Sequence, residues 1–151
     1  MNNPAKDTET LDLSEHILKL WMDNSDPNDD FHRRYVVMRT MGDKLVLGRP
    51  ANVMHRAFPG MPYVEGLGVH LFTMDLAARS MTQPVQYSLV DRDSRGRVEA
   101  LLRGDEKEFE QLSARHLGQT SSSAPNWRFA CRSLTEASRK ALGERASEVS
   151  P

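Results

Sequence analysis

The pattern near the carboxyl end of the chain constrains the fold most. Between Trp127 and Arg132, large apolar residues alternate with arginine and alanine, which is the period-two pattern of a strand with one buried face. Directly afterwards, Ser133 and Glu136 have the spacing of a capping box, and apolar residues then recur at helical intervals up to Leu142. The pattern predicts a strand that runs into a helix without a loop between them.

Length and composition indicate one globular domain. The 151 residues suffice for a single core, and 38% hydrophobic with 27% charged residues is ordinary for a globular protein. We expect residues 1–10 to be an unanchored polar terminus, residues 11–143 to form the domain and residues 144–151 to be a polar tail.

The charge balance and the lack of long apolar runs exclude several classes of protein. Twenty Lys and Arg residues against 21 Asp and Glu leave a formal charge of −1, so no basic field would attract nucleic acid. Because no apolar run could span a bilayer and the N-terminus lacks a signal-peptide pattern, we expect a cytoplasmic protein that binds no membrane. The single cysteine, Cys131, excludes an internal disulfide and cannot build a thiolate metal site; no metal is expected.

Hydrophobic periodicity predicts a domain that contains both helices and strands. The expected helices cover residues 12–21, 51–58, 67–78 and 105–117, and the expected strands cover residues 35–38, 45–47, 85–90, 97–102 and 127–132. The serine-rich segment 119–126 is the expected loop.

The order of these elements and three short motifs resemble a PAS domain. Ser133-Leu134-Thr135-Glu136 stands where that family has an Asp-Ile-Thr-Glu junction, Arg49-Pro50-Ala51 where it has Asn-Pro-Ala, and Asp93 to Gly96 where it has an Asp-Gly hairpin turn. The resemblance implies an α+β fold: a five-stranded antiparallel sheet with short helices on one face, an N-terminal flanking helix and a C-terminal exit helix. Residues 105–126 depart from it as a helical insertion.

The same resemblance implies a function. A stand-alone PAS-like module would be sensory or regulatory: it would bind a small apolar ligand or a partner protein and signal through dimer or partner contacts. The residues expected to line its ligand cavity are His70, Leu67, Met74, His55 and Tyr87. In haem-binding members a histidine on the helix before the third strand ligates the iron, so His70 is the candidate for haem; a partly buried histidine that donates to a carbonyl is the alternative.

The first expected helix carries a possible dimer interface. Leu13, Ile17, Leu20 and Trp21 form one apolar stripe, which a flanking helix can bury on its own sheet or against a second subunit. Because the second arrangement is common in PAS domains, we expect a homodimer through this stripe.

The segment from His55 to Gly66 supports an alternative from a different class. HRAFPGMPYVEG resembles the His-Phe-Pro-Gly-x-Pro stretch of hot-dog-fold dehydratases, where the histidine is a base and a helix N-terminus polarises the thioester carbonyl. Here two residues separate His55 from Phe58, and His70 or Leu71 stands where the acidic partner is expected. The alternative function is therefore an acyl-thioester dehydratase or thioesterase that uses His55.

Overall fold

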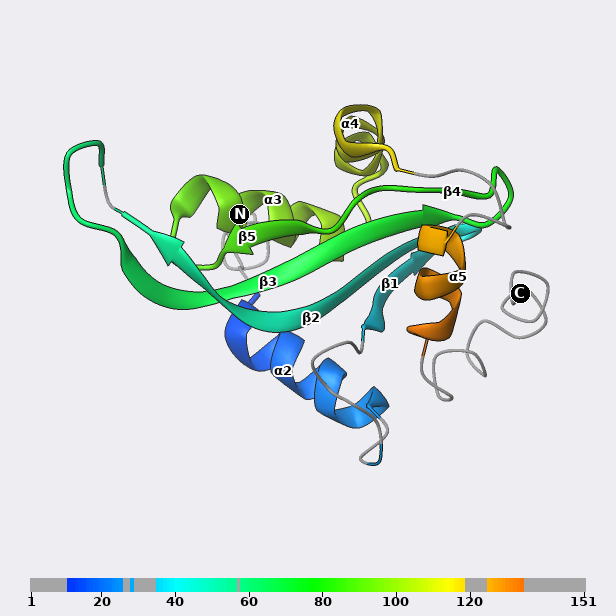
Figure 1. Cartoon of the computed structure of the whole chain (residues 1–151), viewed down its shortest axis with the longest axis horizontal. Coiled ribbons are helices and arrows are strands. Elements are labelled where there is room, and N and C mark those ends of the chain that lie inside the picture. The colour runs from blue at the N-terminus through cyan, green and yellow to red at the C-terminus, as the bar shows by residue number, and fades with distance from the viewer. Residues whose placement is uncertain (1–10, 26–27, 29–34, 57, 119–124, 135–151) are drawn as a thin grey trace, which may run out of the picture.

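A five-stranded antiparallel sheet organises the fold, and helices cover it. The computed structural model describes residues 11–25, 28, 35–56, 58–118 and 125–134 (Figure 1). In chain order the elements are α2 (Leu13–Asn24), β1 (Val36–Met41), β2 (Lys44–His55), β3 (Val64–Asp75), β4 (Ser80–Met81), β5 (Val85–Ser88), α3 (Arg92–Leu102), α4 (Glu106–His116) and α5 (Pro125–Arg132). The predicted α+β class with a five-stranded antiparallel sheet is confirmed.

The long hairpin of β2 and β3 is the centre of the sheet. Its pairs run without interruption from Lys44 and Asp75 to His55 and Val64. The neighbouring strands are much shorter, because β1 pairs with β2 only up to Gly48, and β5 and β4 pair with β3 only beyond residue 67. The distal half of the hairpin therefore has no further strand beside it in the described chain.

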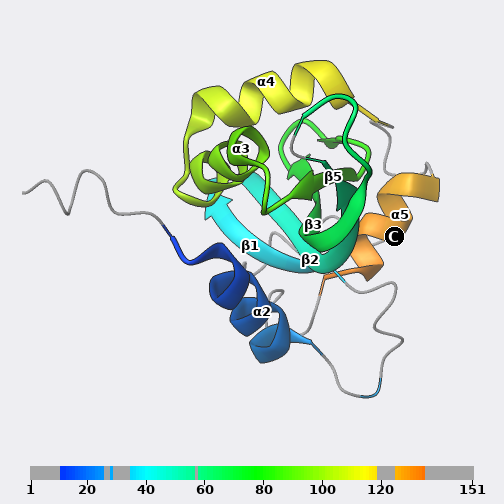
Figure 2. The same ribbon diagram turned by 90° about the vertical axis from the view of Figure 1, so that its left-hand side faces the viewer.

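Side-chain alternation along β2 and β3 divides the core into two clusters. Val46 and Leu71 belong to the cluster that the sheet shares with α2, α3 and α4. Leu47 and Phe72 belong to the other cluster, which α5 covers with the fully buried Trp127. Figure 2 shows α3 lying between the curved sheet and α4.

Residues 97–102, expected to be a strand, lie in α3, so that prediction is wrong. The carboxylate of Asp91 accepts a hydrogen bond of 2.9 Å from the Ser94 N–H and caps the helix. Val98, Leu101 and Leu102 are buried at positions i, i+3 and i+4, which is helical spacing. The expected turn at residues 91–96 is thus the capped first turn of a helix.

The expected strand at residues 127–132 is helix α5. Trp127, Ala130, Cys131 and Leu134 are the buried apolar side chains between Pro125 and Leu134, at helical intervals of three, four and seven residues, and Pro125 is the first helical residue. The two-residue alternation was therefore the weaker of two patterns in the same residues. The expected helix after Leu134 lies outside the described residues, as does most of the serine-rich segment.

Residues 51–58 and 67–78, expected to be helices, lie largely in β2 and β3. Pro50 lies outside the described pairing of β2 with β1, which reaches only Gly48, and proline is tolerated where a strand has no ladder partner. Gly68 lets β3 approach its neighbours closely, since a Cβ there would lie 2.5 Å from both the Tyr87 carbonyl oxygen and Val53 Cγ2. Gly68, inside the expected helix 67–78, also disfavours a helix.

The motifs that carry the PAS resemblance lie in secondary-structure elements other than those expected. Residues 49–51 lie in a strand and residues 93–96 in a helix. Ser133 follows α5, and its hydroxyl donates to the Phe129 carbonyl oxygen at 2.9 Å; the rest of that motif lies outside the described residues. The expected helix at residues 105–117 is confirmed as α4, capped by Asp105, but it follows a helix and not a strand.

Candidate functional site

The distal half of the β2–β3 hairpin extends past the helices (Figure 1). We call it the arm: residues 52–56 and 58–67, which comprise the unflanked strand ends and the described part of their connection. A two-stranded ribbon alone is marginally stable in water, so the arm needs other contacts to keep its shape.

Local contacts stiffen the arm. Val53 is only 5% exposed, and the His55 ring lies over Gly66, where a Cβ would approach Nε2 to 2.7 Å. At the tip, the Arg56 guanidinium lies 4.6 Å from the centre of the Tyr63 ring, a cation–π distance. A turn at the tip is closed by the Met61 N–H, which donates to the Phe58 carbonyl oxygen at 3.1 Å.

The arm exposes apolar side chains to an unusual degree. Six of the ten large apolar residues that the described chain exposes lie on it: Met54 (59%), Phe58 (59%), Met61 (41%), Tyr63 (55%), Val64 (52%) and Leu67 (37%). Isolated apolar residues on a surface are normal, whereas a contiguous group of this kind marks an interaction surface.

One face of the arm continues into an apolar groove beside α2. Met54 and Leu67 share this face, since their cross-strand pairs, Met54–Glu65 and Asn52–Leu67, are two positions apart in the register. At the base of the arm lies a cavity of about 150 Å³ with almost entirely apolar walls. Its lining residues are Ser14, Glu15, Ile17, Leu18, Pro50, Leu67, Gly68 and Leu89. We call this side of the arm the groove face.

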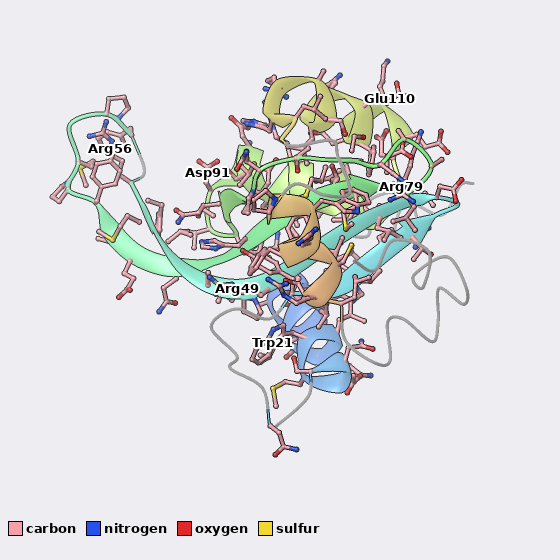
Figure 3. The ribbon with its side chains drawn as sticks, turned by 45° about the vertical axis from the view of Figure 1, so that its right-hand side comes forward. Trp21, Arg49, Arg56, Arg79, Asp91 and Glu110 are labelled. Atoms are coloured by element: carbon pink, nitrogen blue, oxygen red, sulfur yellow. The ribbon has the colours of Figure 1, made fainter. Side chains whose placement is uncertain are left out.

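The opposite face of the arm borders a larger, more polar cavity. This tip cavity of about 390 Å³ lies between the arm and the start of α3, and His55, Val64, Asp91 and Arg92 are among its lining residues. Figure 3 shows Arg56 at the end of the arm and Asp91 on the body of the protein. The hydrogen bond from the Ser94 backbone, and more weakly the nearby His55, lower the pKa of Asp91. Asp91 therefore stays ionised near neutral pH and caps α3.

His70 lies on β3 and not on a helix, opposite Arg49 on β2. Arg49 Nη2 is 3.2 Å from His70 Nδ1, and because a guanidinium only donates, Nδ1 is the acceptor. Burial, and then the Arg49 charge, lower the pKa of His70. The Arg49 guanidinium also lies 5.5 Å from the centre of the Tyr35 ring.

These surroundings do not fit haem. The haem interpretation needed His70 on a helix that faces an apolar cavity, but its Nδ1 accepts from a charged guanidinium on a neighbouring strand. A porphyrin at this ring would require an apolar wall where Arg49 lies.

The structure does not bring the other predicted ligand residues together. Leu67 lines the groove face, whereas Met74 is buried in the cluster under α5. Tyr87 is buried in the cluster of α2, α3 and α4, and burial raises the pKa of its hydroxyl. Their grouping depended on a helical stripe, and a strand sends alternate residues to opposite faces.

The predicted dimer stripe on α2 is largely occupied by the protein's own core. Leu13 and Ile17 are 0% and 1% exposed, and Leu20 and Trp21 pack partly buried against the same cluster. Leu13 and Ile17 therefore pack within the protein's own core, and the homodimer itself stays a prediction. The exposed apolar residues of α2 are instead Leu18 and Met22, at 51% and 60%.

The exposed residues of the arm were missed as a group by sequence reasoning. Pro59-Gly60 between two apolar runs is a turn signal that could have indicated a hairpin, and Gly60 has a φ of 94°. The degree of exposure has no sequence signal, because Phe58 and Tyr63 are residue types typical of a core or of an interface.

Two kinds of site are absent from the part of the chain that the structure describes. No group of three or more His, Cys, Asp and Glu side chains there could hold a metal ion. None of the described helices combines the length and apolar character needed to cross a membrane. Comparison of the chain with family models, curated proteins and solved structures found no match.

Proposed function

We propose that the protein is a regulatory module that acts by binding another protein through the arm. The observation that carries this proposal is the exposure of six large apolar side chains on one projecting hairpin. Burying apolar surface contributes about 25 cal/mol per Å², and the arm leaves this contribution unused within the chain. The regulatory role itself rests on the resemblance to PAS domains.

The shape and chemistry of the arm suit a protein partner better than a small ligand. Tyr63, Phe58 and the two methionines are residue types enriched at protein interfaces, and thioether side chains adapt to irregular partner surfaces. No described strand pairs with either edge of the ribbon at residues 52–55 and 64–66, so these edges can also pair with a strand. The predicted ligand residues, by contrast, point to different faces of the sheet.

The thioester alternative has one observation in its favour. His55 and Asp91 border the same cavity. Asp91 could therefore supply the acidic partner that the sequence lacks at residues 70 and 71. Against it, residues 58–63 connect two strands and no helix follows them to polarise a carbonyl. Asp91 is also already engaged as the cap of α3. The arm therefore favours binding over catalysis.

Photo-cross-linking inside cells tests the proposed function. We would place p-benzoylphenylalanine at Phe58 and, as a matched control, at Leu117, which is similarly exposed at 53% but lies at the end of α4. We expect a discrete light-dependent adduct from position 58 and none from position 117. Equal yields at the two positions, or no adduct at position 58, would contradict a binding role for the arm.

A further inference from the structure

Arg49 is a half-buried cation that has no carboxylate partner among the described residues. Its side chain contacts His70, with Nη2 3.2 Å from Nδ1, and Tyr35, whose ring centre lies 5.5 Å from the guanidinium. Arg49 Nε is covered by the protein and has no hydrogen-bond partner in the described chain. A cation that is partly removed from water and left unpaired costs free energy, so the fold alone does not explain Arg49.

The surroundings of Arg49 supply no counter-ion. Its neighbours on this face of the sheet are Tyr35, Leu47, Ala51, His70, Phe72 and Gln86. None of them is acidic, and no carboxylate contributes to the lowered pKa of His70, which burial and the Arg49 charge explain. The charged residues of α5 on this side are the exposed Arg128 and Arg132. Glu65 pairs with Met54 and therefore lies on the opposite face, the groove face.

Two neighbours hold the guanidinium in a fixed position. Tyr35 is only 5% exposed, and its ring packs edge-on against Phe72 with 4.9 Å between ring centres. His70 accepts at Nδ1 from one N–H of Nη2. Because Nε is covered, a ligand reaches Arg49 at the end of the guanidinium, where Nη1 and Nη2 present further N–H groups. Two N–H donors side by side match the two oxygens of a carboxylate.

The amount of charge at this position distinguishes a carboxylate from a phosphate. Burial and the neighbouring guanidinium lower the pKa of His70, so the imidazole is neutral near pH 7 and Arg49 supplies a single half-buried positive charge. A monocarboxylate cancels that charge. A phosphate group carries more than one negative charge at neutral pH and would leave an unpaired negative charge beside the Tyr35 ring.

We propose that Arg49 binds the carboxylate of a small monocarboxylate ligand through the end of its guanidinium, with His70 and Tyr35 as positioning residues. This site is independent of the proposed function, because it lies on the face of β2 and β3 opposite to the groove face. Failure of one proposal therefore leaves the other standing.

Titration with acetate, followed by the backbone amide NMR signals of Arg49 and His70, tests the site. Acetate replaces chloride at constant ionic strength, so that screening does not change. We expect saturable shifts with a Kd of about 1–10 mM, as for a weak charge-assisted contact. Arg49→Gln should bind acetate about tenfold more weakly or worse. Arg49→Lys should fall between the two, because it keeps the charge and loses the fork of donors.

Three further variants serve as controls. Arg128→Gln removes an exposed arginine from the helix that covers the same face, and we expect it to bind acetate like the wild type. His70→Leu removes the acceptor that holds Arg49 and should weaken binding about fivefold. His70→Asn keeps a side-chain acceptor and should restore most of the affinity, which a purely structural role for His70 would not predict.

Several results would overturn the proposal. Shifts that do not saturate by about 100 mM acetate, or equal binding by the wild type and Arg49→Gln, would exclude Arg49 as the ligand site. If circular dichroism shows that Arg49→Gln is unfolded, Arg49→Lys decides in its place. Tighter binding of inorganic phosphate than of acetate would overturn the choice of a carboxylate. Tighter acetate binding by Asp29→Asn with Asp30→Asn would show that a carboxylate of this chain is the natural occupant.

Discussion

The two halves of the β2–β3 hairpin use similar residues in opposite ways. In the half that belongs to the body, Leu47 and Phe72 face each other across the sheet and are 0% exposed. In the arm, Met54 and Val64 are 59% and 52% exposed, although the same two strands continue in the same register. The body half lies between flanking strands and under helices, whereas no described strand flanks the arm and the described helices border it only in part.

The comparison shows which apolar residues the fold explains. Burial in the two clusters accounts for the apolar side chains of the body, because removal of that surface from water drives folding. The exposed side chains of the arm gain little from folding and promote aggregation. Their presence is explained when another surface covers them, which is the basis of the proposed function.

Truncation in the body should have the largest effect. Trp127→Ala removes a fully buried indole from the cluster under α5, and we expect it to lower the free energy of unfolding by about 3–5 kcal/mol, the usual cost of such a cavity. Urea denaturation followed by circular dichroism measures it. Trp127→Phe is the control, because it keeps a ring and removes Nε1, a buried donor without a partner among the described residues. A loss below about 1 kcal/mol for Trp127→Ala would mean that α5 is not part of the folded body.

Substitution where the two halves meet should have an intermediate effect. Gly68→Ala places a Cβ 2.5 Å from the Tyr87 carbonyl oxygen, so we expect a loss of about 1–3 kcal/mol from overpacking. Gly96→Ala is the matched control: it meets nothing within 4 Å and lies inside α3, so it should stabilise the protein by about 0.5–1 kcal/mol. Thermal unfolding of both variants compares them, and a stabilising Gly68→Ala would show that the base of the arm is not closely packed.

Sequence reasoning predicted the elements whose pattern allowed one interpretation. Strand β1 and the first part of β2 follow from continuous apolar runs, and α4 follows from its Asp105 cap. Strand β5 lies within the strand expected at residues 85–90. It failed where two periods fit the same residues. Leu67, His70 and Met74 would share one face of a helix. In a strand, His70 and Met74 lie on the face opposite Leu67, and the pairing of β3 with β2 shows that this segment is a strand.

The candidate site was less accessible to sequence reasoning than the fold. The groove face joins α2 to residues more than thirty positions away in β2 and β3, and no local pattern encodes that meeting. The stripe of α2 was recognised as apolar, but whether its own sheet or another chain covers it depends on tertiary packing. Leu67 was the one predicted ligand residue that lines the groove.

The free energy of unfolding of the double variant Phe58→Ser with Tyr63→Ser tests the central claim most directly. It should be measured in protein dilute enough to be monomeric, so that association does not contribute. Because both side chains are more than half exposed, we predict a value within about 0.5 kcal/mol of the wild type. A loss of about 2 kcal/mol or more would show that these residues serve the fold, and would contradict the claim that the arm reserves them for a partner.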